Sequence, residues 1–122
     1  MAATSNFKLD QGADAVISFV LRDKSGPLDL TGYTAAMQMR VSVFASEAID
    51  TLTTDNGRLT IDALEGKITA SFPHAITGAY PAQVVVYDLE IESADGIIKR
   101  VLEGNIKICP EVTRVKCKRE KS

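Results

Sequence analysis

The stretch VVYDLEIESADG, residues 85–96, decides the fold of this chain, because apolar and acidic residues alternate along it and a turn ends it. The alternation places Val85, Tyr87, Leu89 and Ile91 on one side and Asp88, Glu90 and Glu92 on the other. A period of two is typical of a strand with one buried face. Ala94-Asp95-Gly96 supplies a tight turn. The pattern therefore predicts the first arm of a β-hairpin.

Residues 97–104 form the expected returning arm of this hairpin. Ile98 and Leu102 are predicted on one side, and Lys99 and Glu103 on the other. Opposite charges on the two arms would pair across the strands in either of two registers. The charges concerned are Glu90 and Glu92 on the first arm and Lys99 and Arg100 on the second.

The same pattern of short alternating runs and turn residues recurs along the chain. Further strands are expected at residues 15–22, 33–42, 58–62, 67–72 and 105–109. Residues 43–50 suit either a helical turn or an irregular connection, and residues 73–81 suit a connection with room for one helical turn. About seven or eight short strands predict an all-β, antiparallel β-sandwich or small barrel. We expect one domain at residues 1–113, followed by a tail at residues 114–122.

Charge is distributed unevenly along the chain, although its formal net charge is only −2. The tail from residue 114 carries five basic residues and one acid, so its charge is +4 and that of residues 1–113 is −6. Such a tail could be a solvated terminus, hold nucleic acid, or pair with the acidic surface of a neighbouring subunit. The candidate partner-binding residues are Arg114, Lys116, Lys118, Arg119 and Lys121.

Apolar runs and cysteines point to synthesis in the cytosol. No apolar run approaches the about 20 residues that a membrane-spanning helix needs, and the first residues do not resemble a secretory signal. The only two cysteines, Cys109 and Cys117, lack both the spacing and the histidine partners of a zinc site. We therefore expect reduced thiols and no membrane partner.

Groups that catalyse reactions are scarce in the sequence. The single histidine, His74, follows a proline in an expected loop and is interpreted as a surface residue. The acids at 88, 90 and 92 are expected on a wet face, where nothing would drive their pKa values apart. The acids around Asp55-Asn56-Gly57 do not match a calcium loop, and no glycine-rich phosphate loop is present. The sequence predicts no enzyme, no cofactor and no metal.

Several motifs, in order, resemble a known group of proteins. They are PLDLTGYTAAMQMR at residues 27–40, NGR at 56–58, GKI at 66–68, YDLEI at 87–91, RVLEG at 100–104 and PEVTR at 110–114. Together they resemble small tail- and baseplate-associated structural proteins of tailed bacteriophages. The resemblance implies an immunoglobulin-like β-sandwich in several copies per virion, made in the bacterial cytoplasm. Its partners would be other virion proteins and copies of itself. The tail after Arg114 is longer and more basic than this resemblance implies.

Three functions remain open on the sequence. The first is an adaptor that docks on tail, baseplate or connector subunits through sheet edges and loops. A capsid decoration protein is a variant of the first. The third is a module that binds host-surface carbohydrate by stacking a sugar on an exposed aromatic ring, for which Phe7, Phe44 and Tyr80 are the candidate platforms. Nucleic-acid binding by the basic tail is less favoured than these.

Overall fold

A computed structural model describes residues 2–112 of the chain. The predicted tail, with its five basic candidate residues and Cys117, lies outside the described residues, as does the predicted domain boundary at 114.

Strands make up 52% of the described chain and helices 6%, which confirms the all-β prediction. Its strands are β1 (Ala3–Thr4), β2 (Phe7–Asp10), β3 (Ala15–Val20), β4 (Arg22–Asp23), β5 (Gly26–Pro27), β6 (Thr34–Arg40), β7 (Asp50–Thr53), β8 (Leu59–Asp62), β9 (Lys67–Phe72), β10 (Val84–Glu92) and β11 (Ile98–Cys109). A 3-10 turn, η1 (Ala63–Glu65), precedes β9, and one helical turn, α1 (His74–Thr77), follows it. Residues 43–49, left open by the sequence, form an irregular connection.

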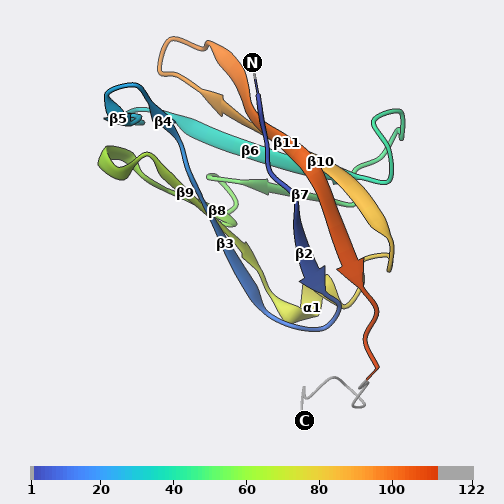
Figure 1. Cartoon of the computed structure of the whole chain (residues 1–122). Helices are drawn as coiled ribbons and strands as arrows, with labels where there is room; N and C mark the ends of the chain where they lie inside the picture. The colour runs from blue at the N-terminus through green and yellow to red at the C-terminus, as the bar shows by residue number, and fades with distance from the viewer. Residues whose placement is uncertain (1, 113–122) are drawn as a thin grey trace.

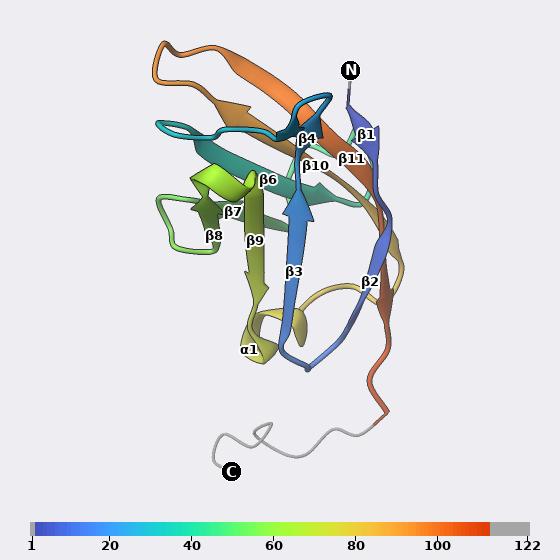
Figure 2. The same ribbon diagram turned by 60° about the vertical axis from the view of Figure 1, so that its left-hand side comes forward.

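Two sheets face each other across the core (Figures 1 and 2). The larger has the order β1-β11-β10-β6-β7, with β2 also paired to β11, and the smaller has the order β3-β9-β8. A small hairpin of β4 and β5 stands apart. Residues 2–112 contain eleven strands, more than the about seven or eight predicted; three of them have only two residues, and β2 and β7 were not predicted.

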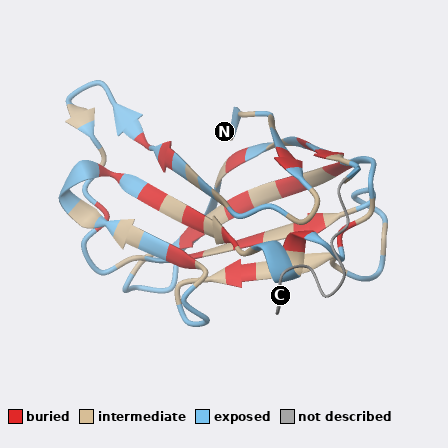
Figure 3. Ribbon diagram, turned by 90° about the horizontal axis from the view of Figure 1, so that it is seen from below, coloured by how far each residue is buried: buried red, intermediate tan, exposed pale blue. Residues whose placement is uncertain are grey.

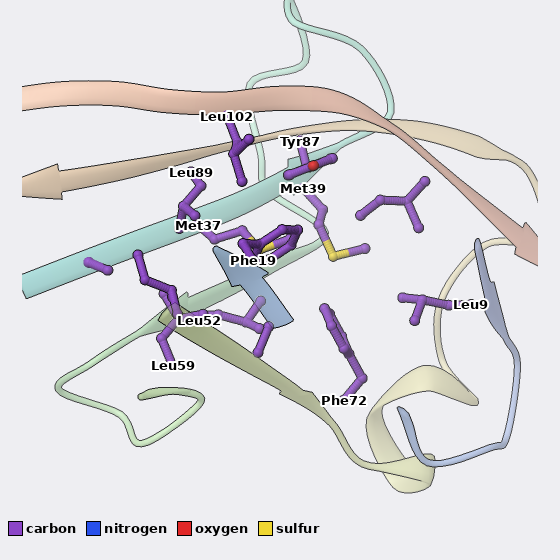
Figure 4. Packing of buried hydrophobic residues seen from close by; sticks show 14 of the residues in the cluster. Leu9, Phe19, Met37, Met39, Leu52, Leu59, Phe72, Tyr87, Leu89 and Leu102 are labelled. Atoms are coloured by element: carbon purple, nitrogen blue, oxygen red, sulfur yellow. The ribbon is translucent and has the colours of Figure 1, made fainter. Parts of the chain in front are cut away.

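Burial alternates along the strands as the sequence predicted (Figure 3). On β6, Ala35, Met37 and Met39 are buried, and on β10 every second residue from Val85 to Ile91 is buried. Four aromatic rings meet where the sheets face each other, with the ring centroids of Phe7 and Tyr87 5.2 Å apart. Figure 4 shows Phe19, Phe72 and Tyr87 in this cluster. Burial of this apolar surface is the main stabilising contribution to the fold.

The larger sheet is mixed, so the prediction of purely antiparallel pairing is wrong for its first strands. Both β1 and β2 run parallel to β11. Between them the chain passes close over Gly104, where an added Cβ would lie 2.3 Å from the backbone oxygen of Ser5. The Tyr87 hydroxyl donates to that oxygen at 2.6 Å. These contacts join residues far apart in sequence, and the alternation pattern carries no signal for them.

A β-bulge in β11 changes which residues face the core. Leu89 pairs with Leu102, but the next pair is Glu90 with Arg100, so Val101 is an extra residue. The bulge moves Ile98 to the face of Glu92, where it is 59% exposed. The predicted placement of Ile98 beside Leu102 is therefore wrong. The two strands predicted at 97–104 and 105–109 are one continuous strand.

Candidate functional site

The outer face of the larger sheet, away from the core, carries the polar residues that alternate with the buried ones. Acidic side chains line β10 there, as predicted, and Arg100 lies close to two carboxylates. Its Nε is 3.4 Å from Asp88 Oδ2 and its Nη1 is 3.3 Å from Glu103 Oε1. All three side chains are about half exposed. Solvent weakens such pairs, so this face is a hydrated, mixed-charge surface.

A hollow of about 610 Å³ opens on this outer face. One rim is formed by Thr4 and Asn6 before β2, and the other by Val43 in the connection from β6 to β7. Its floor is polar, with Gln38, Arg40, Asp88, Glu90, Arg100 and Glu103 among the lining residues. A hollow lined by several charged and amide side chains suits a polar ligand or a protein side chain better than an apolar cofactor.

The connection between β6 and β7, residues 41–49, presents apolar side chains to solvent. Phe44 is 93% exposed, Val43 71% and Val41 48%. The connection is nevertheless held in place, because Arg40 donates from Nη1 to the Ala45 carbonyl at 3.0 Å and from Nη2 to Gln38 Oε1 at 2.8 Å. Exposed apolar residues on a fixed loop are typical of a protein-binding site. We call residues 41–45 the apolar tip.

The three candidate sugar platforms differ sharply in exposure. Tyr80 is only 4% exposed, and Phe7 packs on the aromatic cluster of the core. The prediction for Tyr80 is therefore wrong, because its ring is buried, whereas Phe7 is partly buried with its ring packed against the core. Phe44 is the only one of the three that is fully available.

Tyr80 belongs to a polar cluster at the side of the core where β7 and β8 lie. Arg58 donates to both carboxylate oxygens of Asp50, the shorter contact being 2.8 Å, and the Tyr80 hydroxyl donates to Asp50 Oδ2. Arg58 Nε also donates to the Ser71 carbonyl at 2.8 Å. Burial, together with the hydrogen bond to the Asp50 carboxylate, raises the pKa of Tyr80 far above its usual value. The cluster is satisfied internally and ties the two sheets together.

His74 lies at the surface, as predicted, and contacts one carboxylate. Its Nδ1 is 3.0 Å from Asp14 Oδ1, and its backbone N–H donates to the same oxygen at 2.6 Å. These hydrogen bonds hold the pKa of Asp14 below its usual value. The pair joins the start of α1 to the turn before β3.

The free edges of the sheets differ in how they are protected. At β7, the backbone groups of Thr51 and Thr53 point away from β6, and side chains satisfy three of these four groups. Thr51 N–H donates to Asp50 Oδ1, Thr53 N–H to Asn56 Oδ1, and the Thr51 carbonyl accepts from Asn56 Nδ2. The sequence pattern around Asn56 indicates only a turn. Side-chain hydrogen bonds therefore occupy most of the backbone groups that an added strand would use at this edge.

Other sequence predictions concern absences or masked residues. Among residues 2–112, no group of three or more His, Cys, Asp and Glu side chains is arranged to hold a metal. Within the same residues no helix is long and apolar enough to cross a membrane. Cys109 is a free thiol. The basic candidates from Arg114 to Lys121 lie outside the described residues, so the structure does not bring them to any site.

Comparison with known proteins adds no family assignment. No protein-family model matches the chain, and no curated protein matches it.

Proposed function

We propose that this chain is a non-enzymatic structural protein of a tailed-phage particle. It would dock on neighbouring tail, baseplate or connector subunits through the apolar tip and the adjoining hollow. The observation that carries the proposal is the exposure of Phe44 at 93% on a loop braced by Arg40. A braced loop loses less conformational freedom on binding, so less of the free energy gained by burying the ring is lost to ordering the loop. The motifs quoted above supply the assignment to phage particles.

We also propose that the fold is an immunoglobulin-like sandwich. The order β11-β10-β6-β7 opposite β3-β9-β8 corresponds to strands G, F, C and C′ opposite B, E and D of that fold. Phe19 on β3 and Tyr87 on β10 stack with centroids 6.3 Å apart, on the two strands that carry the inter-sheet disulfide in antibody domains. An aromatic pair in place of a disulfide suits a chain that folds in a reducing compartment.

Purified particles and one pair of variants test the docking function. Phe44→Ser removes the apolar tip, and Leu64→Ser is the matched control, because Leu64 is 74% exposed on η1 outside the hydrophobic core. We expect the unaltered chain and the control in particles, and the Phe44 variant in at least about tenfold lower amount, equivalent to about 1.4 kcal/mol of binding. Absence of the unaltered chain from particles would refute the proposal. A small copy number per particle would indicate a tail or connector protein, and hundreds of copies would indicate capsid decoration.

Carbohydrate binding is a second candidate, favoured by one observation. Phe44 adjoins, through Val43, a hollow with amide, carboxylate and guanidinium groups, which can donate to and accept from sugar hydroxyls. A glycan array with no signal for the unaltered chain would dismiss it. A signal that survives Phe44→Ser would place any sugar elsewhere.

A further inference from the structure

Strand β3 has a free edge with unsatisfied backbone groups. It pairs with β9 on one side only, and Leu21 N–H donates to the Gly66 carbonyl at the end of that ladder. Alternation along an antiparallel ladder then directs the N–H and C=O groups of Val16, Ser18 and Val20 away from β9. None of these groups has a hydrogen-bond partner among residues 2–112.

This edge differs from the others in lacking protection. The strand reads AVISFV and contains no charge and no proline, and Val16 and Val20 are 67% and 51% exposed. By contrast, β7 is capped by side chains, β2 carries Lys8 and Asp10, and β8 has four residues with Leu59 only 1% exposed. An uncharged, extended edge is a template for an added strand.

The surroundings of this edge leave apolar side chains that one extended segment would cover. In Figures 1 and 2, β2 lies on the side of β3 opposite β9, but it belongs to the larger sheet and does not pair with β3. Ala15 and Ile17, whose side chains point towards the core, are only partly buried here. One extended strand would satisfy these backbone groups and cover the partly exposed side chains of Ala15 and Ile17.

The chain itself supplies such a segment in residues 113–122, TRVKCKREKS. Val115 and Cys117 alternate with Arg114, Lys116 and Lys118, as in a strand with one apolar side. Ten residues can span about 33 Å, more than the about 20 Å of a six-residue strand such as β3. The segment also carries a positive charge, opposite to that of residues 1–113, which favours its association with the rest of another copy.

The point where the described chain ends indicates which copy receives the segment. Glu111 N–H donates to Gln11 Oε1 at 3.1 Å, beside the turn that leads into β3. From there the last described residues lead away from both sheets, beyond α1 (Figures 1 and 2). At the last described residue the chain is thus heading away from the β3 edge of its own copy.

We propose that residues 113–122 of one copy add as a strand to the free edge of β3 in the next copy. Each copy would give one segment and receive one. Such head-to-tail contacts close into rings or extend into filaments. This inference deepens the proposed function and rests on it for its setting, but it is tested on the purified chain alone.

Two variants separate the giving and receiving surfaces. Ser18→Pro removes an edge-facing N–H that β9 does not use, and Ser18→Val is its control, because it keeps the N–H while also losing the hydroxyl contact to Thr69. In an added strand, the N–H of either Val115 or Lys116 points to β3, because neighbouring residues direct these groups to opposite sides. The double variant V115P/K116P therefore removes one donor to β3 in both cases, and its control V115T/K116Q keeps both N–H groups.

Sedimentation at increasing concentration measures the outcome. We expect the unaltered chain and both controls to assemble, and each proline variant alone to associate at least about tenfold more weakly. A mixture of the two proline variants should form a one-to-one complex, because one retains the segment and the other retains the edge.

Three results would overturn the inference: an unaltered chain that stays monomeric, assembly unaffected by Ser18→Pro, or a mixture that stays monomeric. Hydrogen exchange at Val16, Ser18 and Val20 of the unaltered chain gives an independent measurement if a variant does not fold. Protected amides in a monomer would mean that the segment adds to its own copy, which also contradicts the inference. Assembly in solution by a chain absent from particles would refute the proposed function alone.

Discussion

The Asn56 side chain protects the edge of β7 by bonding to Thr51 and Thr53 of the same short strand. Its Nδ2 donates to the Thr51 carbonyl at 3.0 Å, while its Oδ1 accepts from Thr53 N–H at the same distance. The following Gly57 has φ +79°, which the turn requires. An Asn-Gly turn therefore protects a sheet edge as well as reversing the chain.

We expect Asn56→Ala to destabilise the fold by about 1–2 kcal/mol, because it removes hydrogen bonds to backbone groups of an edge strand. Asn56→Asp should have a smaller effect, since its oxygens still accept from Thr53 and Arg58 while only the donor to Thr51 is lost. Urea unfolding measures both. Equal effects of the two variants would contradict the role assigned to the acceptor oxygen.

Gly104→Ala should displace the N-terminal strands. The new Cβ would meet the Ser5 oxygen at 2.3 Å and the Asn6 side chain at 2.7 Å, so the crossing segment must move. We expect a loss of about 1–3 kcal/mol, as for other overpacked sites. Thermal unfolding and hydrogen exchange at residues 3–10 would measure it.

Tyr87→Phe is the comparison for this site, because it removes only the hydroxyl bond to Ser5. It should destabilise by about 1 kcal/mol and leave β2 protected from exchange. If Gly104→Ala lowered the free energy of unfolding no more than Tyr87→Phe, the close approach of the two segments would not be a constraint on the fold.

Local alternation predicted the elements of this chain better than their partners. The β10 arm, the burial of Met37 and Met39, and the helical turn after Pro73 all follow from neighbouring residues. The pairing of β2 with β11 could not be predicted in this way, because it depends on Gly104 and Tyr87 meeting a segment about a hundred residues away. The extra residue at Val101 was likewise missed, since an unbroken alternation and a bulged one look alike in sequence.

The candidate sites show the same difference between what local sequence predicts and what only the folded chain provides. Phe44 was identified as a candidate platform from its residue type, but its bracing by Arg40 depends on the folded loop. The Asp50–Arg58 pair was missed, because charges eight residues apart with a turn between them give no pattern.

Asp50→Ala should destabilise the fold by up to about 3 kcal/mol. It leaves Arg58 with no carboxylate among the described residues, and both side chains of the pair are only about 15% exposed. Asp50→Asn should destabilise the fold less than Asp50→Ala, because its amide oxygen still accepts from Arg58 or Tyr80. Denaturant unfolding of both variants tests this, and no difference between Asp50→Ala and the unaltered chain would mean that solvent replaces the pair fully.

Alkaline pH should weaken the fold through Tyr80. Burial and the Asp50 carboxylate raise its pKa in the folded state above the usual 10.0. In the unfolded chain Tyr80 loses its proton near pH 10, while the folded chain keeps it, so the unfolded state binds fewer protons. The contribution of this group is therefore fully present below pH 10 and declines as the pH rises beyond it.

Tyr80→Phe cannot ionise at this position, so its melting temperature should fall less steeply above pH 10 than that of the unaltered chain. Tyr87, whose pKa burial also raises, remains in both proteins and sets the residual slope. Parallel profiles for the two proteins would show that Tyr80 titrates with the same pKa whether the chain is folded or unfolded.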